Sequence, residues 1–98
     1  MAILIKCNHS VLPQEQEIQI KPENETNFKL KELYKYLRCD MIEVLYLNSS
    51  EIMIIDENGK LTNKPVNNSA TRIFRENIKN TRDYICGHAI ICHTSQLK

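Results

Sequence analysis

Two cysteines and two histidines lie within eight residues of one another near the C-terminus, in the segment DYICGHAIICH that runs from Asp83 to His93. Thiolates and imidazoles bind zinc, and a cysteine beside a histidine is also the pair that forms an activated thiol nucleophile. The same segment is rich in isoleucine and alanine, which indicates a buried β-strand instead. A metal site, a thiol active site and a structural strand are therefore the three alternatives.

The geometry of a strand argues against zinc. Side chains on one face of a strand are separated by roughly 6.6 Å, so Cys86 and Cys92 would lie roughly 20 Å apart. Ligand atoms of a zinc site lie within ~4 Å of one another, so the strand supplies at most Cys86 and His88. Further ligands would have to come from elsewhere in the chain, and the candidates are Cys7, His9 and Cys39. No C-x-x-C or H-x₃₋₅-H spacing is present, and we expect no metal and no other cofactor.

A catalytic role for Cys86 and His88 has less support still. A reactive cysteine lies in a partly exposed, electropositive environment, whereas isoleucine, alanine and tyrosine surround Cys86 in the sequence. Gly87 between the two residues indicates a bulge or a close packing approach. We therefore predict that Tyr84 to His93 is a strand that closes the core.

Three carboxylates, Glu51, Asp56 and Glu57, flank the second of two predicted hairpins. Paired carboxylates carry out acid–base catalysis or bind cations. The neighbouring Asn58-Gly59 pair is typical of a tight turn, because both residues tolerate positive φ. We therefore interpret the carboxylates as the solvated end of a hairpin, after which Lys60 and Leu61 return as a short strand.

The segment from Pro65 to Arg72 is the best ligand-site candidate. Small polar residues lead into a helix start, where unpaired backbone N–H groups favour an anion, and the Arg72 guanidinium can add bidentate contacts. Ordinary helix capping by Ser69 or Asn68 explains the same pattern. The residues predicted to contact a small anionic ligand are Asn67, Asn68, Ser69, Thr71 and Arg72, with Glu57 reaching in from the preceding turn.

Basic residues form a stripe on each predicted helix. Such stripes contact phosphates in nucleic-acid-binding proteins, and tyrosines can stack on bases. Solvated basic faces are also common, and the tyrosines fit amphipathic packing. The residues of the two stripes are Lys31, Lys35, Arg38, Arg72, Arg75 and Lys79.

The composition is that of an ordinary globular chain. Its 98 residues predict one domain, residues 1–98. Thirteen basic against twelve acidic residues leave a net charge of +1, so the basic excess typical of a dedicated nucleic-acid binder is missing. No apolar run approaches the ~20 residues of a membrane span, and MAILIKCNH does not resemble a signal peptide. We therefore expect a cytosolic protein with no membrane partner and reduced cysteines.

Apolar periodicity predicts an α+β domain with a mostly antiparallel sheet and two helices, in the order strand-strand-helix-strand-strand-helix-strand. Both helices are expected on one face of the sheet, and the C-terminal residues 94–98 as a frayed tail. The predicted strands are residues 3–7, 16–21, 41–47, 51–56 and 84–93. The first predicted helix spans residues 28–38 and is capped by Thr26 or Asn27. The second is capped by Ser69, and its inner face carries Ala70, Ile73, Phe74 and Ile78.

Four segments together resemble a small uncharacterised family, the domain of unknown function 3846. They are Ile42-Glu43-Val44, residues 53–61 (MIIDENGKL), residues 63–71 (NKPVNNSAT) and residues 83–91 (DYICGHAII). The match spans residues 28 to 92. In the family a Gly-Gly-Tyr usually precedes the "IEV" strand, whereas Cys39-Asp40-Met41 stand there in this chain.

The resemblance implies a bacterial setting, often on phages or other mobile elements, and brings no accepted activity or catalytic residues. Our first hypothesis is therefore a small cytosolic, non-enzymatic binding protein that acts on a host protein or a small anionic ligand, in counter-defence or regulation by analogy. A nucleic-acid-associated accessory factor is the alternative, and an enzyme is the third class. Assembly into a homo-oligomer is left open.

Overall fold

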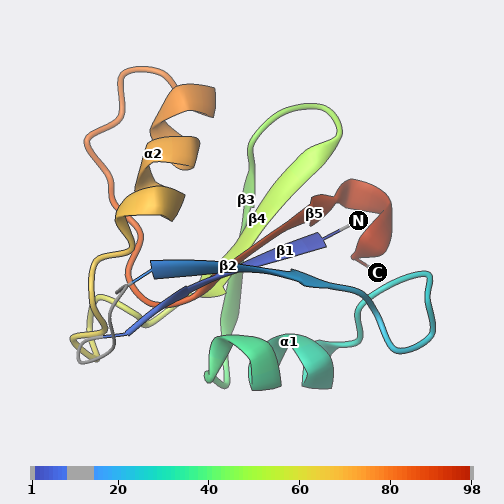
Figure 1. The fold of residues 1–98 in the computed structure, drawn as a ribbon. Helices are drawn as coiled ribbons and strands as arrows, with labels where there is room; N and C mark the ends of the chain where they lie inside the picture. The colour runs from blue at the N-terminus through green and yellow to red at the C-terminus, as the bar shows by residue number, and fades with distance from the viewer. Residues whose placement is uncertain (1, 9–14, 98) are drawn as a thin grey trace.

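One five-stranded antiparallel sheet runs through the centre of the protein, in the spatial order β2-β1-β5-β4-β3 (Figure 1). The computed structural model describes residues 2–8 and 15–97. Within them the elements follow the predicted order, which confirms the α+β fold. Their bounds are β1 Ala2–Cys7, β2 Glu15–Ile20, α1 Leu30–Leu37, β3 Ile42–Tyr46, β4 Glu51–Asp56, α2 Asn68–Asn77, β5 Ala89–His93 and a 3₁₀ helix, η1, Thr94–Gln96.

Strand β5 joins two hairpins into the single sheet. The hairpins β1–β2 and β3–β4 form as predicted, and β5 lies between β1 and β4. Its register pairs Ile91 with Ile3 on one side and with Met53 on the other. The last strand therefore does close the core, as the sequence indicates.

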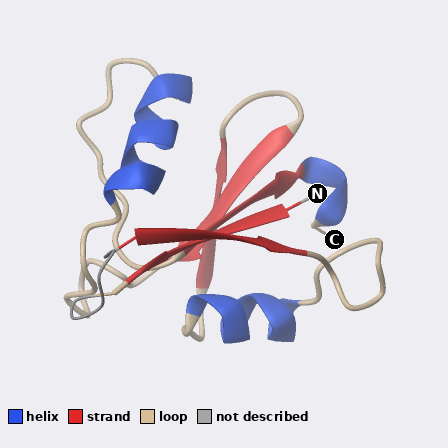
Figure 2. Ribbon diagram, in the orientation of Figure 1, coloured by secondary structure: helices blue, strands red, loops and turns tan. Residues whose placement is uncertain are grey.

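The two helices cover opposite faces of the sheet, which corrects the prediction that both lie on one face (Figure 2). Leu33 and Leu37 of α1 pack in one buried cluster, whereas Ala70 and Phe74 of α2 pack in another. The physical reason is the uninterrupted apolar run of β4. Ile52 and Ile54 face α1 while Met53 and Ile55 face α2, because successive side chains of a strand point to opposite faces.

Helix α1 is shorter than predicted. Neither Thr26 nor Asn27 caps it; instead the Glu32 carboxylate accepts the Lys29 backbone N–H at 2.7 Å, which is one half of a capping box. The helix ends at Arg38, whose φ of 54° is left-handed. Arg38 thus ends the helix just before Cys39-Asp40-Met41, with no glycine at the turn.

Strand β5 is also shorter than predicted, because the extended geometry breaks at Gly87, whose φ is +85°. The preceding residues run alongside the entry to α2 instead of joining the sheet. The Asn67 N–H donates to the Ile85 carbonyl at 2.7 Å, and the Gly87 N–H donates to the Pro65 carbonyl at 2.8 Å. Cys86 therefore lies outside β5 and does not share a sheet face with Cys92.

Two further segments differ from prediction. Lys60 and Leu61 belong to a turn that extends to Asn63, so no extra strand forms there. Gly59 is required by a close approach, since a Cβ would lie 2.7 Å from the Cys86 carbonyl oxygen.

The C-terminal segment is held by the 3₁₀ helix, whose Gln96 carbonyl accepts the Phe28 N–H at 2.7 Å. Within the described residues, no helix is long and apolar enough to cross a membrane.

Candidate ligand-binding site

At the start of α2, where we predicted an anion, a carboxylate of the chain itself is bound. Glu15, the first residue of β2, accepts the backbone N–H groups of Asn68 at 2.8 Å and Ser69 at 2.9 Å, and the Ser69 hydroxyl at 2.5 Å. Burial favours the neutral form, but the Ser69 hydroxyl and these N–H groups outweigh it and lower the pKa of Glu15. The donors that the sequence offers to a ligand are therefore occupied by an internal anion.

Asn67 and Thr71 bond to the chain and are closed to solvent. The Asn67 amide donates to the carbonyls of Ile5 at 3.1 Å and Gly87 at 2.9 Å, and its oxygen accepts the Ala70 N–H at 3.0 Å. The Thr71 hydroxyl accepts the Ile85 N–H at 2.9 Å. Asn67, not Ser69 or Asn68, is thus the helix cap, and it also joins α2 to β1.

The other two predicted site residues lie apart from each other. Arg72 is exposed and lines a shallow hollow on α2 together with Arg75 and Glu76. Glu57 lines a different pocket, which also includes Lys60. The turn therefore does not fold back to bring Glu57 or Lys60 beside Arg72.

The predicted carboxylate group is also divided. Glu51 and Asp56 stand at opposite ends of β4, and Asp56 is buried, not solvated. Its carboxylate pairs with Lys64 at 2.6 Å and accepts the Asn58 N–H at 2.9 Å. Lys64 also donates to the last carbonyls of α1, so this pair ties the loop after β4 to the helix end.

Cys86 and His88 line different pockets, so the two side chains do not face one shared cavity. Burial raises the pKa of the Cys86 thiol, as it does for Cys7 and Cys92, and the value for Cys92 rises to about 11. Among residues 2–8 and 15–97 there is no group of three or more histidine, cysteine, aspartate or glutamate side chains placed to hold a metal. His9, a predicted candidate ligand, lies outside the described residues.

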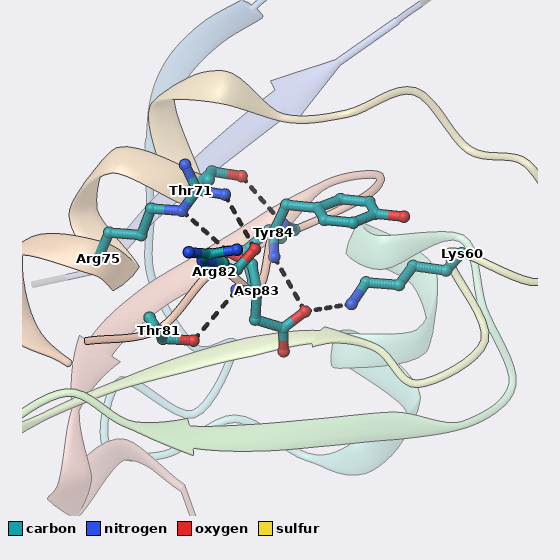
Figure 3. Close-up of polar contacts among 8 residues, drawn as sticks. Lys60, Thr71, Arg75, Thr81, Arg82, Asp83 and Tyr84 are labelled. Carbon is teal, nitrogen blue, oxygen red and sulfur yellow. Dashed lines mark hydrogen bonds and ion pairs between the residues drawn. The ribbon is translucent and has the colours of Figure 1, made fainter. Parts of the chain in front are cut away.

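The segment before Cys86 is held by a polar network beside α2 (Figure 3). Lys60 pairs with the Asp83 carboxylate and lies 4.4 Å from the centre of the Tyr84 ring. The Arg75 guanidinium donates to the carbonyls of Asp83 at 3.0 Å and Arg82 at 3.1 Å. Arg75 is therefore engaged with the chain itself, and these contacts serve the fold.

A pocket of about 400 Å³ lies on the α1 side of the sheet, between that helix and the β1–β2 hairpin. Its volume falls in the range of small-molecule sites. Its lining combines apolar side chains with several polar and charged ones, the composition expected of such a site. The apolar residues are Leu4, Ile18, Ile20 and Tyr36, and the polar residues are Lys6, Glu23, Glu32, Lys35, Arg38 and His88.

His88 lies in an electropositive part of this pocket. The residue is 7% exposed, and the Cys7 backbone N–H donates to Nδ1 of its ring at 3.0 Å. A neutral ring then carries its proton on Nε2. Burial, followed by the charges of Arg38, Lys6 and Lys64, lowers the pKa of His88 to about 4. An anion near Arg38 and Lys6 would be stabilised by the same field.

Two carboxylates, Glu23 and Glu32, line the pocket together with the three cations Lys6, Lys35 and Arg38. Glu32 accepts the backbone N–H groups of Lys29 and Glu23 through its two oxygens, at 2.7 and 2.8 Å, and these bonds lower the pKa of Glu32. The carboxylate is therefore committed to the N-terminus of α1. Lys6, Lys35 and Arg38 form no ion pair with any described residue.

We predict that His88 makes the stability of the protein pH-dependent. Its pKa is about 4 in the folded state against 6.5 when unperturbed, so the unfolded chain binds more protons between these values. Stability should therefore fall by about 2 kcal/mol from about pH 7.5 to about pH 5. Urea unfolding at several pH values measures this.

The His88→Asn variant is the control, because asparagine can still accept the Cys7 N–H but does not titrate. It should lose most of the pH slope above pH 5. An unchanged slope in His88→Asn would contradict the assignment.

Sequence reasoning missed this pocket because its residues come from four distant segments. The sequence places Lys35 and Arg38 in a basic stripe, and it offers His88 as a metal ligand or as the partner of Cys86 in a thiol site. The one usable signal was the i, i+3 spacing of Lys35 and Arg38, which places both on one side of α1.

Comparisons with known proteins agree with the resemblance seen in the sequence. No curated protein and no solved structure matches the chain. The family described as "Domain of unknown function (DUF3846)" matches residues 1–96. Because this match covers almost the whole chain, the protein belongs to the DUF3846 family.

Proposed function

We propose that the protein is a small non-enzymatic binding protein that takes an anionic small molecule in the pocket between α1 and the β1–β2 hairpin. The observation that carries the proposal is that Lys6 and Arg38 line the same pocket as the buried His88, whose pKa is lowered by burial and then by these charges. A carboxylate or phosphate at this end would gain charge-assisted hydrogen bonds. The aliphatic residues and Tyr36 would contact the remainder of the ligand.

This proposal keeps the ligand class inferred from the sequence and moves the site. At the α2 start, the N–H donors already serve Glu15, so an external anion would have to displace a bound carboxylate. In the α1 pocket the cations have no such partner among the described residues. The family's setting on phages and mobile elements, which the resemblance implies, favours a regulatory or counter-defence role for such binding.

A nucleic-acid role has less support. The basic residues of α1 and those of α2 lie on opposite faces of the sheet, so they cannot follow one phosphate backbone as a single surface. Arg75 is moreover bonded to carbonyls of the chain. A salt titration of DNA or RNA binding with a steep slope would favour this alternative instead.

The test is a calorimetric titration with a panel of carboxylates and phosphorylated metabolites, repeated on matched variants. For whichever compound binds, Arg38→Gln should weaken binding by roughly 1.5–3 kcal/mol, the scale of a charge-assisted hydrogen bond. Lys31→Gln, which removes an exposed α1 cation that does not line the pocket, is the control and should bind normally.

Arg72→Gln separates this proposal from the α2 site predicted from the sequence. If Arg72→Gln weakens binding and Arg38→Gln does not, the ligand binds at α2. If both variants bind every compound of the panel as the wild type does, neither cation contacts the ligand and the proposal fails.

A further inference from the structure

Strand β3 forms one edge of the sheet, and its outer backbone groups have no partner strand among the described residues. The Leu47 N–H donates to the Glu51 carbonyl at 3.0 Å, and the Glu57 N–H donates to the Met41 carbonyl at 3.1 Å. Hydrogen-bonded residues alternate along an antiparallel ladder, so the odd-numbered residues of β3 bond to β4. Ile42, Val44 and Tyr46 therefore direct their N–H and C=O groups outward.

This edge has few of the features that normally prevent pairing. Proteins protect edge strands with lysine, proline or bulges, whereas the sequence IEVLY contains none of these and one charge, Glu43. The Tyr46 side chain is 68% exposed, and the adjoining Met41 is 50% exposed. The opposite edge, β2, carries Glu15 and Glu17 and borders the ligand pocket.

We propose that β3 pairs with β3 of a second copy of the chain, antiparallel and centred on Val44, so that two sheets join into one. In this register Val44 faces Val44, Ile42 faces Tyr46, and every outward N–H and C=O of these residues finds a partner. Cross-strand pairs of aromatic and β-branched residues of this kind are favourable.

The charge pattern of the strand is compatible with this partner and register. Glu43 lies opposite Leu45 of the second copy, so the two Glu43 carboxylates do not meet. A slip by two residues in one direction would place the two Glu43 side chains directly opposite each other, which is unfavourable. The pairing is symmetric, so both copies use the same residues, as in a two-fold interface. The contact is short, so we expect a reversible, concentration-dependent dimer.

Cysteine cross-linking tests the register. In Val44→Cys the two new residues face each other at a Cα separation of about 5.5 Å, which a disulfide spans. In Tyr46→Cys the two new residues lie about 13 Å apart, so no bridge forms. The four native cysteines are the same in both variants. We expect a covalent dimer from Val44→Cys under mild oxidation; equal cross-linking of the two variants, or none, would overturn the proposal.

Sedimentation equilibrium tests the interface without introduced cysteines. The wild type should dimerise with increasing concentration, and Tyr46→Lys should weaken dimerisation about tenfold, since two Ile42–Tyr46 pairs are lost. Gln16→Lys makes the same charge change on the exposed β2 edge and should leave dimerisation unchanged. A wild type that stays monomeric, or a dimer that responds to Gln16→Lys instead, rules out pairing through β3.

Discussion

Replacing Asn67 with alanine is expected to lower the free energy of unfolding by about 4 kcal/mol. The side chain is fully buried and makes three hydrogen bonds within the chain. Alanine would leave the buried carbonyls of Ile5 and Gly87 without a donor, at a cost of about 1–3 kcal/mol each, and would remove the cap of α2, worth about 1 kcal/mol. Urea or thermal unfolding measures the change.

The neighbouring Asn68 provides the matched control. Its side chain is exposed, so Asn68→Ala should change stability by less than about 0.5 kcal/mol. Asn67→Asp should destabilise as strongly as alanine, because it keeps an acceptor for the Ala70 N–H but directs a carboxylate at two carbonyl oxygens. If the Asn67→Ala protein is stable but loses ligand binding, Asn67 belongs to a binding site and not to the structural core.

Replacing Lys64 with methionine should cost about 3–4 kcal/mol, the scale for removing one partner of a buried ion pair. The Lys64 ammonium pairs with Asp56 and donates to the carbonyls of Leu37 at 3.2 Å and Arg38 at 2.9 Å. The Asp56 side chain is 5% exposed, so methionine would leave the buried Asp56 carboxylate without its counter-charge. The carbonyls of Leu37 and Arg38 at the end of α1 would lose the donor that Lys64 supplies. Equilibrium unfolding in denaturant provides the measurement.

Lys60→Met is the comparison, because Lys60 also pairs with an aspartate but near the surface. The side chains of Lys60 and Asp83 are 46% and 53% exposed, and exposed pairs contribute at most about 1 kcal/mol. If the two lysine variants lose the same stability, the Lys64–Asp56 pair is not the tie between the loop and α1 that its contacts indicate.

The strands and their order could be predicted because the signals are local. The alternation around Ile18 and Ile20 and the apolar run from Ile52 to Ile55 each identify a strand. The run of β4 also shows burial on both faces, which is typical of a strand covered on both sides. The prediction of both helices on one face does not take account of this signal.

The start of β5 and the pocket beside α1 could not be predicted because they depend on tertiary contacts. The segment before Gly87 continues the apolar pattern of the strand, and only its pairing with residues 65–67 diverts it from the sheet. The polar residues around Asn67 indicated a helix start correctly. Nothing local shows that Glu15, more than fifty residues earlier, occupies the N–H groups of that helix.

The central claim is that an anionic small molecule binds against Arg38 on the α1 side of the sheet. Native mass spectrometry of wild-type, Arg38→Gln and Arg72→Gln proteins, purified in parallel from the protein's own host, tests it most directly. We predict a bound small-molecule mass on the wild type and on Arg72→Gln that is lost from Arg38→Gln. A wild type without any bound mass, or a mass retained by Arg38→Gln and lost from Arg72→Gln, would contradict the account.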